Sequence, residues 1–408
     1  MSAVKTTTKG VAAQIPDVDE MLQRARELRP FLEERARQTE IDGRVSTQAT
    51  EKFVAGGFFN LLKPKRFGGY EFGPAAITQI GFELGRACAS SSWCVTVGNV
   101  GAWAAACWPL EAQMDVWGKD PDTLVAGSVI PTGKCEAVEG GFVVEGRWGF
   151  ASNCDNAQWI YIAAVLAGKD GAPASSCWFL IPRDELRIDH DSWRVSGLQG
   201  TGSKTVYTAS PVFVPAHRMI LFSDLAEGRN PGRAVEGNIV AHFSFPTFSA
   251  FALVGPILGA AQGALDAFVE MMRAKIRASL RPGVALTAAQ NPHTQVTVGA
   301  ASAAIDAAML VLTSDLTAAE EKVRNGIELT VEERIKVRRS MAFGARQATE
   351  AVNMLFEGAG ATALELSLSV QRHWRDANAG ARHMGLDPNA IYGLVGQERF
   401  GLKPMGQF

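Results

Sequence analysis

The segment Gly146-Arg-Trp-Gly-Phe-Ala-Ser-Asn-Cys-Asp155 lies in a part of the chain whose residue pattern differs from that on either side. From about Thr123 to Leu221, short runs rich in β-branched and aromatic residues alternate with Gly, Pro, Asp and Ser. One such run is Gln158-Trp-Ile-Tyr-Ile-Ala-Ala-Val165. Runs of this length between turn residues are typical of β-strands. The middle third of the chain is therefore predicted to form an antiparallel sheet.

Helical periodicity occurs on both sides of this stretch. From Asp17 to about Trp117, apolar residues recur three and four positions apart, which is the period of an amphipathic helix. The same period returns after the Gly- and Pro-containing segment 227–233. It predicts four further long helices, over about 246–279, 292–325, 331–358 and 364–381. Four long helices with short connections are typical of a helical bundle.

The order of these patterns predicts an α+β protein with three parts. They are an N-terminal α-helical domain over 1–120, a central β-sheet domain over 121–232 and a C-terminal helical bundle over 233–408. With 408 residues, of which 47% are hydrophobic, the chain has enough apolar side chains for sizeable cores. The segment 87–110 carries no charge but holds several serines, a threonine and an asparagine. We predict a buried helix there instead of a membrane span.

Charge and cysteine content restrict the partners and the compartment that we expect. The 40 basic and 42 acidic residues nearly cancel, and no run of like charges occurs. We therefore expect no nucleic acid and no membrane as partner, and a small, mostly uncharged ligand instead. The six cysteines include no Cys-x-x-Cys pair, and the amino terminus lacks the pattern of a signal peptide. A reducing cytoplasm is the expected location.

Several common chemistries lack their motifs in this chain. There is no His-Glu-x-x-His, no Gly-x-Ser-x-Gly and no Cys/His cluster with zinc spacing, so we expect no metal site. The segment Gly197-Leu-Gln-Gly-Thr-Gly-Ser-Lys204 differs from a phosphate loop because Ser203 stands where the lysine should follow the last glycine. No strand is followed by Gly-x-Gly-x-x-Gly and a helix, so reducing equivalents are expected to come from another protein.

Three segments carry a resemblance to a known family. They are Gly146–Asp155, Asp191–Lys204 and Trp374-Arg-Asp-Ala-Asn-Ala-Gly-Ala-Arg-His383. Together they resemble the flavin-contacting elements of two-component, reduced-flavin-dependent aromatic monooxygenases built on the acyl-CoA dehydrogenase fold. This family includes hydroxyphenylacetate hydroxylase and 3-hydroxy-9,10-seconandrostatrienedione hydroxylase oxygenases. The order of helical domain, antiparallel β domain and four-helix bundle also fits that fold over nearly the whole chain.

The resemblance implies a complete reaction scheme. Reduced FMN or FAD would diffuse from a separate NAD(P)H:flavin reductase, and O₂ would be the cosubstrate. A C4a-hydroperoxyflavin would then hydroxylate a small aromatic substrate, and the oxygenase would be a homotetramer. Two catalytic residues are implied, Ser152 beside the flavin N5 position and His383 close to the flavin ring. Read without the resemblance, Ser152 is a turn residue after a strand and His383 a structural histidine near a helix end.

Further cofactor contacts are implied by the same resemblance. They are Trp93, Ser152, Asn153, Gly200, Thr201, Gly202, Ser203, Lys275, Arg277, Gly358 and Gly360. Each has a structural alternative that the sequence leaves open. The tryptophan suits a protein core, the 200–203 segment suits a hairpin loop, the two basic residues suit a solvated helix surface and the last two glycines suit a helix stop.

The substrate pocket is expected to differ from that of hydroxyphenylacetate hydroxylases. Where those relatives carry a histidine, a serine and an arginine, this chain has Gly101, Gly127 and Pro246. A buried carboxylate without a partner would cost several kcal/mol, so a neutral fused or bulky aromatic, indole-like or phenolic, is expected. The possible apolar lining, which could equally be bundle core, comprises Phe243, Phe245, Phe248 and Phe251.

Alternative functions remain open at this stage. An acyl-CoA dehydrogenase-like dehydrogenase or oxidase would hold oxidised FAD tightly, but no glutamate lies between Leu366 and Gly396, where many dehydrogenases carry their base. A monooxygenase acting on ring sulfur or nitrogen is a close variant. A non-catalytic flavin- or ligand-binding relative would keep the fold alone.

Overall fold

The computed structural model describes residues 15–168, 174–277, 286–406 and 408. Its first part consists of helices α1 (Val18–Asp42), α2 (Thr47–Ala55), α3 (Pro74–Gly85), α4 (Ala89–Ala106) and α5 (Leu110–Trp117). Helix α1 begins where the Asp17 side chain accepts from the Glu20 N–H and ends at Gly43, whose φ is 59°. Both ends follow the ordinary capping rules.

The central part is built on two sheets. A six-stranded sheet has the order β8-β2-β1-β4-β5-β9, and a three-stranded sheet has the order β3-β7-β6. The strands are β1 (Val125–Val138), β2 (Gly141–Glu145), β3 (Arg147–Ala151), β4 (Trp159–Leu166), β5 (Ser175–Pro182), β6 (Arg187–Asp189), β7 (Lys204–Tyr207), β8 (Val212–Pro215) and β9 (Met219–Leu221).

The prediction of a purely antiparallel sheet is wrong for one pair of strands. Strands β1 and β4 are parallel, with Gly127 opposite Tyr161, whereas the other pairs of the six-stranded sheet are antiparallel. The reason is the chain path, because β2 and β3 intervene and return the chain to the end of the sheet where β1 began. Residue composition alone does not determine this path.

The C-terminal part is helical. After α6 (Phe222–Ala226) and α7 (Phe245–Phe248) come α8 (Phe251–Ala274), α9 (Pro292–Arg324), α10 (Val331–Ala359), α11 (Ser369–Gly380) and α12 (Pro388–Arg399). The helix predicted over 246–279 is divided at Ser249–Ala250 and ends at Ala274. The last two positions of that prediction, 278 and 279, lie outside the described residues. The one predicted over 364–381 begins at Ser369, and α12 was not predicted.

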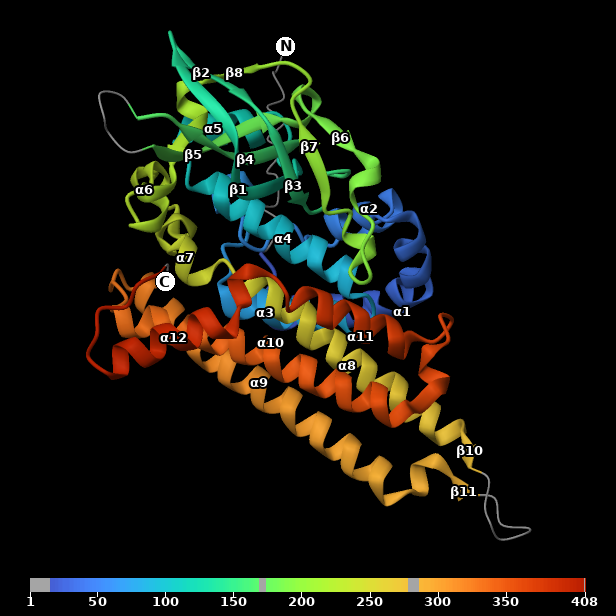
Figure 1. The fold of residues 1–408 in the computed structure, drawn as a ribbon. Helices are drawn as coiled ribbons and strands as arrows, with labels where there is room; N and C mark the ends of the chain where they lie inside the picture. Colours follow the sequence, from blue (N-terminus) through green and yellow to red (C-terminus); the bar gives the residue numbers. More distant parts are fainter. Residues whose placement is uncertain (1–14, 169–173, 278–285, 407) are drawn as a thin grey trace, which may run out of the picture.

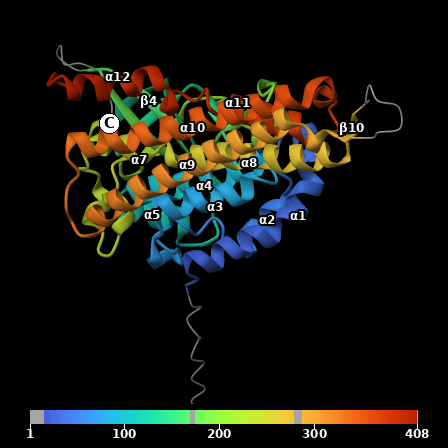
Figure 2. The same cartoon turned by 90° about the horizontal axis from the view of Figure 1, so that it is seen from below.

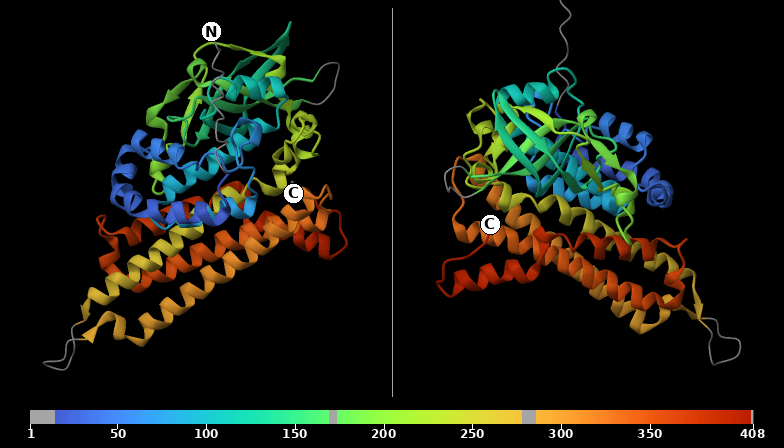
Figure 3. Two further views of the ribbon diagram at one scale, coloured as in Figure 1. Left: turned by 180° about the vertical axis from the view of Figure 1, so that it is seen from behind. Right: turned by 45° about the horizontal axis from the view of Figure 1, so that its top comes forward.

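Helix α4 joins the two halves of the molecule. The sheets lie on one side of it and α8 to α11 on the other (Figure 1), and these four helices run side by side in the view from below (Figure 2). Almost every residue of α4 is buried, which confirms the prediction of a buried helix there. Helix α1 covers one flank, and the β10–β11 end of the bundle projects away from the sheets (Figure 3).

Helices α3 and α8 pack with their backbones in close contact. A Cβ atom built on Gly255, Gly259 or Gly263 of α8 would lie 2.4–2.5 Å from a backbone carbonyl oxygen of α3 or of the residue that follows it. The three glycines recur every four residues and therefore share one face of α8. Glycine is required there because no other residue permits this approach of the two helices.

We expect Gly259→Ala to lower the free energy of unfolding by about 1–3 kcal/mol, the usual cost of overpacking a core. The built Cβ lies 2.4 Å from Phe82 O. The control is Gly393→Ala in α12, where no atom lies within 4 Å of the built Cβ; it should raise the free energy of unfolding by about 0.5–1 kcal/mol. Urea unfolding of both variants measures the difference, and equal effects would contradict the packing described here.

Candidate functional site

A row of hydrogen-bonding groups lies where α4, β3 and β7 meet. The indole Nε1 of Trp93 donates to Ser152 Oγ at 3.3 Å. Ser152 Oγ lies 2.7 Å from Ser203 Oγ, and Ser203 Oγ lies 2.7 Å from Thr201 Oγ1. Thr201 Oγ1 donates to the backbone carbonyl of Leu198 at 2.8 Å. We call this row, from Trp93 to Leu198, the hydroxyl chain.

The hydroxyl chain has one direction, because each hydroxyl group carries a single proton. The proton of Thr201 is committed to a carbonyl oxygen, so Ser203 must donate to Thr201. Ser152 must in turn donate to Ser203. The indole of Trp93 only donates, and it occupies one of the two lone pairs of the Ser152 oxygen. The other lone pair of Ser152 is left to accept a hydrogen bond from a ligand.

Three residues around the hydroxyl chain have strained backbones. Phe150, Asn153 and Leu198 have φ values of 60°, 62° and 54°, and each such conformation costs on the order of 1–3 kcal/mol. The Asn153 N–H donates to the Thr201 carbonyl at 3.0 Å, which ties the turn after β3 to the loop before β7. Strained residues cluster at functional sites because the surrounding contacts hold them in place.

Asp376 anchors the far end of the hydroxyl chain to helix α11. Its Oδ1 accepts from the Leu198 N–H at 2.6 Å, and the carboxyl group is buried. Burial raises the pKa of Asp376 to about 6, against the opposing effect of the Leu198 hydrogen bond. Near pH 7 the carboxylate therefore predominates and accepts strongly. Leu198, although strained, is held from both its N–H and its carbonyl.

His383 lies across from Trp93, just beyond the end of α11. The two ring centroids are 6.4 Å apart, and the ring planes meet at 60°. The Gly385 N–H donates to His383 Nδ1 at 3.0 Å. A neutral imidazole that accepts at Nδ1 must carry its proton on Nε2. His383 therefore offers one N–H donor away from its own backbone.

The protonation state of His383 follows from its surroundings. Packed protein atoms, and secondly the charge of Arg338, lower the pKa of His383 to about 4. One side of the residue is exposed to solvent, so the packing that lowers the pKa acts from the other side. An uncharged ligand that covers the open side would disfavour the charged form further. At neutral pH the ring is therefore an uncharged donor.

The glycines of the 197–204 loop serve packing between protein segments. A Cβ on Gly200 would lie 2.5 Å from Thr39 Cγ2 of α1, and a Cβ on Gly202 would lie 2.9 Å from Asp155 Oδ2. Lys204 and Asp155 form a nearly buried ion pair behind this loop, at 2.7 Å. The structure thus explains both glycines without a ligand, and their contact with a cofactor stays a prediction.

Four aromatic side chains lie together between the six-stranded sheet, α4 and α7, and Phe222 of α6 and Phe251 of α8 extend the group. Tyr161 stacks on Trp178 at 5.2 Å, and Phe245 meets Trp178 edge-on at 4.9 Å. Phe245 also stacks on Trp103 at 5.0 Å. We call Trp103, Tyr161, Trp178 and Phe245 the aromatic cage. Phe245 lies among these rings as part of the hydrophobic core, and its predicted role in lining the substrate pocket stays a prediction.

Gly127 lies directly against the aromatic cage. A Cβ built on Gly127 would lie 2.0 Å from Cζ of Tyr161, so the tyrosine ring occupies the place that a side chain at 127 would take. Within the described residues no hydrogen bond joins the Tyr161 hydroxyl to the protein, and burial raises its pKa. The next residue, Ser128, donates to Gly149 O at 2.7 Å, which places Gly127 near the turn that carries Ser152.

Three other residues predicted to line the substrate pocket lie at different places. A Cβ on Gly101 would lie 2.0 Å from Val125 O, so this glycine lets α4 approach strand β1. The Pro246 carbonyl accepts from Arg338 at 2.6 Å. Phe248 packs edge-on against Phe243 and lines a separate cavity of about 70 Å³.

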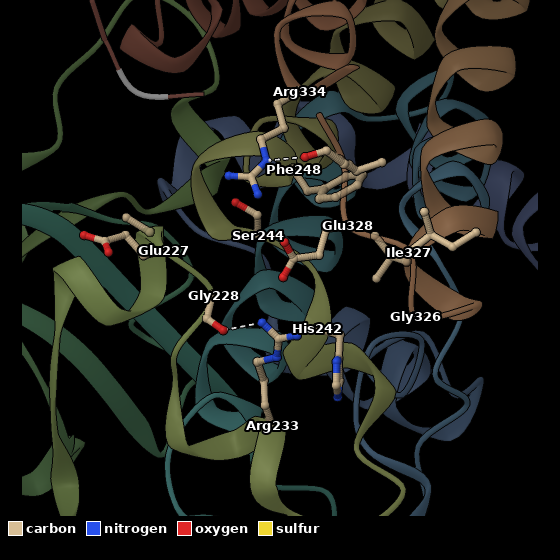
Figure 4. A pocket seen from close by; sticks show the side chains of 13 residues that line it. Glu227, Gly228, Arg233, His242, Ser244, Phe248, Gly326, Ile327, Glu328 and Arg334 are labelled. Carbon is tan, nitrogen blue, oxygen red and sulfur yellow. Dashed lines mark hydrogen bonds between the residues drawn. The ribbon is translucent and has the colours of Figure 1, made fainter. Parts of the chain in front are cut away.

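The cavity beside Phe248 lies between the 226–244 segment and the connection from α9 to α10 (Figure 4). Arg233 and Arg334 line it together with Glu227 and Glu328, and both arginines already donate to backbone carbonyls. Its charges balance, so it favours no ionic ligand. Among the described residues no cluster of three or more His, Cys, Asp or Glu side chains could hold a metal ion.

Comparison with known proteins agrees with this architecture. The family "Acyl-CoA dehydrogenase, N-terminal domain" matches residues 18–118, and "Acyl-CoA dehydrogenase, C-terminal domain" matches residues 251–388. A flavin-dependent monooxygenase, oxygenase subunit HsaA, from Rhodococcus jostii is 37% identical over 93% of this chain and 98% of its own. The chain belongs to this family of monooxygenase oxygenase components.

Two further relatives support the assignment. The oxygenase component of an FADH(2)-dependent resorcinol hydroxylase from Rhizobium sp. is 36% identical over 91% of this chain and 92% of its own. The crystal structure of 3-HSA hydroxylase from Rhodococcus sp. superposes with a TM-score of 0.89 at 35% identity, covering 96% of this chain and all of that one. The α+β acyl-CoA dehydrogenase-like fold and the monooxygenase prediction, with reduced flavin and O₂, are confirmed.

The remaining predicted cofactor residues of the oxygenase lie at the projecting end of the bundle. Lys275 Nζ donates to Ala359 O at 3.2 Å and to Thr362 Oγ1 at 3.3 Å, so it meets the turn that holds Gly358 and Gly360. Arg277 belongs to β10 (Ile276–Arg277), which pairs with β11 (Leu286–Thr287). We call Lys275 with the 358–362 turn the distal cluster.

The distal cluster is far from the hydroxyl chain in a single chain of the oxygenase. Ile257 lies against Gly380, which in turn lies against Trp93. Lys275 follows Ile257 by 18 residues, almost all of them in α8, which corresponds to about 27 Å along the helix axis. The structure therefore does not bring the two groups of predicted cofactor residues together.

Sequence reasoning missed three residues of this site. Asp376 belongs to the Trp374–His383 segment, and its position two residues after a tryptophan could have marked it. Tyr161 lies within a strand-like run, where an aromatic residue is expected anyway. Arg338 follows Arg334 by four residues and precedes Arg339, a pattern typical of a solvated helix face, so no sequence signal distinguishes it.

Proposed function

We propose that the oxygenase holds the reactive edge of reduced flavin between Ser152 and His383 and hydroxylates a neutral aromatic ring. The directed hydroxyl chain is the observation that carries this proposal. When bound, the reduced flavin would supply the electrons that activate O₂ for transfer of one oxygen atom. The protein residues supply the hydrogen bonds, the orientation and the exclusion of water.

Ser152 would distinguish reduced from oxidised flavin. Reduced flavin carries a proton on N5, whereas oxidised flavin has a bare acceptor nitrogen there. Ser152 is committed to donating to Ser203 and has one lone pair free, so it accepts an N–H and repels a lone pair. An enzyme that captures free reduced flavin from a separate reductase requires this preference.

His383 would donate to the opposite side of the same ligand. Its neutral Nε2–H form can hydrogen-bond to a flavin oxygen or a deprotonated nitrogen without giving up its proton at neutral pH. Trp93, between the two residues, is 6% exposed, and its buried indole limits the access of water on that side. Dry surroundings strengthen such hydrogen bonds and suppress loss of the activated oxygen as peroxide.

The aromatic cage favours a neutral, planar substrate. Its rings are apolar and buried against one another, and burial keeps the Tyr161 hydroxyl in its neutral form. A phenolic hydroxyl could exchange a hydrogen bond with Tyr161, whereas a carboxylate would find no counter-ion among the cage residues. The resorcinol hydroxylase among the relatives acts, by its name, on a neutral phenol. We therefore propose a bulky or fused neutral phenol or indole as substrate.

A second copy of the chain would complete the cofactor site. Helix α9 has an apolar 18-residue window of which only 22% is buried, against 89% for the window in the helix that contains α8. Either helix is long and apolar enough to cross a membrane by composition alone. The outer face of α9 includes Val296 and Leu310, which are 69% and 73% exposed. A homotetramer that covers this face could bring the distal cluster of one copy to the flavin of another.

The partner for reduction would be a separate NAD(P)H:flavin reductase. The name "oxygenase component" of the relatives implies such a partner for this chain as well. All six cysteines are free and buried, which supports the expected cytoplasmic location. We propose a diffusible supply of reduced flavin, with no nucleic acid and no membrane involved.

Replacing Ser152 with alanine should lower the affinity for reduced FMN about tenfold, the value of one lost hydrogen bond in a buried site. The affinity for oxidised FMN should not fall and should rise slightly, because that form lacks the N5 proton and alanine removes the lone pair that repels its nitrogen. Ser128→Ala serves as the control, since Ser128 is also buried but donates to Gly149. Anaerobic fluorescence titration measures both affinities. Equal losses for the two flavin forms in Ser152→Ala would contradict the role of the hydroxyl chain.

Removing the Tyr161 hydroxyl as Tyr161→Phe should raise the KM for a phenolic substrate such as resorcinol about fivefold to tenfold. The kcat and the affinity for reduced FMN should change little, because the stacking on Trp178 persists. Steady-state assays with a purified flavin reductase measure these constants. An unchanged KM together with a weaker binding of FMN would place Tyr161 in the flavin site and contradict the assignment of the cage.

The proposed assembly can be measured by sedimentation equilibrium. The unmodified protein should behave as a tetramer, and Leu310→Glu should dissociate it, because a charge on the apolar face of α9 would be buried without a partner. Ile41→Glu changes an exposed apolar residue of α1 instead and should leave the tetramer intact. A monomer in the unmodified protein would contradict the proposed assembly.

A further inference from the structure

Arg338 is a buried cation beside the proposed flavin site. It lies on α10 and is only 9% exposed. Its guanidinium donates to Pro246 O at 2.6 Å and to Gly385 O at 3.2 Å, while its Nε has no partner. Within the described parts of the chain no carboxylate forms an ion pair with it. The neighbouring Arg339 has such a pair, with Asp315 at 3.5 Å.

A buried charge without a counter-ion is expensive. Burial lowers the pKa of Arg338, but an arginine side chain keeps its proton in proteins. The two carbonyl dipoles offset only part of the several kcal/mol that its desolvation costs. Structural stability alone would favour an uncharged side chain at this position. The charge therefore points to an anionic ligand beside Arg338, where we place the flavin.

The two carbonyl groups that Arg338 binds belong to two segments that meet at its guanidinium. Pro246 lies at the start of α7, next to Phe245 of the aromatic cage. Gly385 lies in the turn that carries His383, and its N–H holds the imidazole at Nδ1. Gly385 thus connects the guanidinium to the imidazole by its two backbone groups. Arg338 is also the charged residue whose field lowers the pKa of His383.

We propose that Arg338 is a positioning residue and the fixed cation of the flavin site, which holds the His383 turn against α7 and favours the anionic form of reduced flavin over neutral oxidised flavin. This inference rests on the proposed flavin site. Ser152 and Arg338 then have different roles. Ser152 selects the N5 proton by a hydrogen bond, and Arg338 selects the negative charge by its field. His383 stays neutral because burial and, secondly, the cation behind it lower its pKa.

The first test uses the flavin-free protein. Variant Arg338→Gln removes the charge but keeps hydrogen-bond donors, Arg338→Lys keeps the charge, and Arg339→Gln is the control with the same change of net charge at the next residue. NMR titration of the His383 ring should show its pKa rising above the value of about 4 in Arg338→Gln, while burial, the larger cause of the shift, keeps it below the ordinary value. It should stay low in Arg338→Lys and in Arg339→Gln. Thermal unfolding of each variant verifies that the comparison is made between folded proteins.

The second test measures anaerobic binding of reduced and of oxidised FMN to the same variants. In Arg338→Gln the preference for reduced FMN should fall about tenfold or more, the effect expected for a unit charge a few ångströms away in a partly buried site. Arg338→Lys should restore most of the preference. Arg339→Gln should keep it fully, because the charge of Arg339 is already paired with Asp315.

Three outcomes are distinguishable from the expected one. If the His383 pKa and the flavin preference are both unchanged in Arg338→Gln, then Arg338 only holds the two segments together. That result would overturn the inference. If Arg338→Gln weakens only the binding of benzoate, used as a carboxylate probe, then the anionic partner of Arg338 is the substrate. That result would overturn the flavin role. Failure of the unmodified protein to bind reduced FMN would refute the proposed function, while a shifted His383 pKa would still show the electrostatic link.

Discussion

The direction of the hydroxyl chain is the constraint on which the site depends. It begins at the Trp93 indole, which can only donate, and ends at the Leu198 carbonyl, which can only accept. Between these ends no hydroxyl group can turn around without leaving a buried partner unsatisfied. The Leu198 N–H is fixed in turn by Asp376 of α11. One polar network thus connects α4, the turn after β3, the loop before β7 and helix α11 of the bundle. It leaves Ser152 free to accept a hydrogen bond.

Much of the architecture followed from periodicity, because helices and strands bury one face at fixed intervals. The long helices and the β-rich middle third were predicted for this reason, and the buried α4 was predicted from its lack of charge. The parallel pairing of β1 with β4 was not, because it depends on the path of the chain between them. The helix that was predicted to begin at 246 is divided at Ser249–Ala250. The hydrophobic periodicity of the sequence does not indicate this division.

The candidate site shows the same division between local and long-range information. Ser152 and His383 belong to segments that could be recognised as they stand in the sequence. Trp93 was named there as well, but the hydrogen bonds of the site could not be predicted, since Trp93 and Ser152 are 59 residues apart and Leu198 and Asp376 are 178 apart. Gly200 and Gly202 were predicted as cofactor contacts, yet their glycine identity is explained by packing. A Gly-rich loop therefore has two physical causes that a single sequence does not separate.

The most direct test of the account is the structure of the protein crystallised anaerobically with reduced FMN. We predict that the flavin N5 lies about 3 Å from Ser152 Oγ, the distance of a hydrogen bond, with His383 Nε2 facing the same ring. The hydroxyl chain should be unchanged from Trp93 to Leu198. A flavin ring bound elsewhere, or one whose N5 faces away from Ser152, would contradict the central claim that this serine accepts the proton that marks reduced flavin.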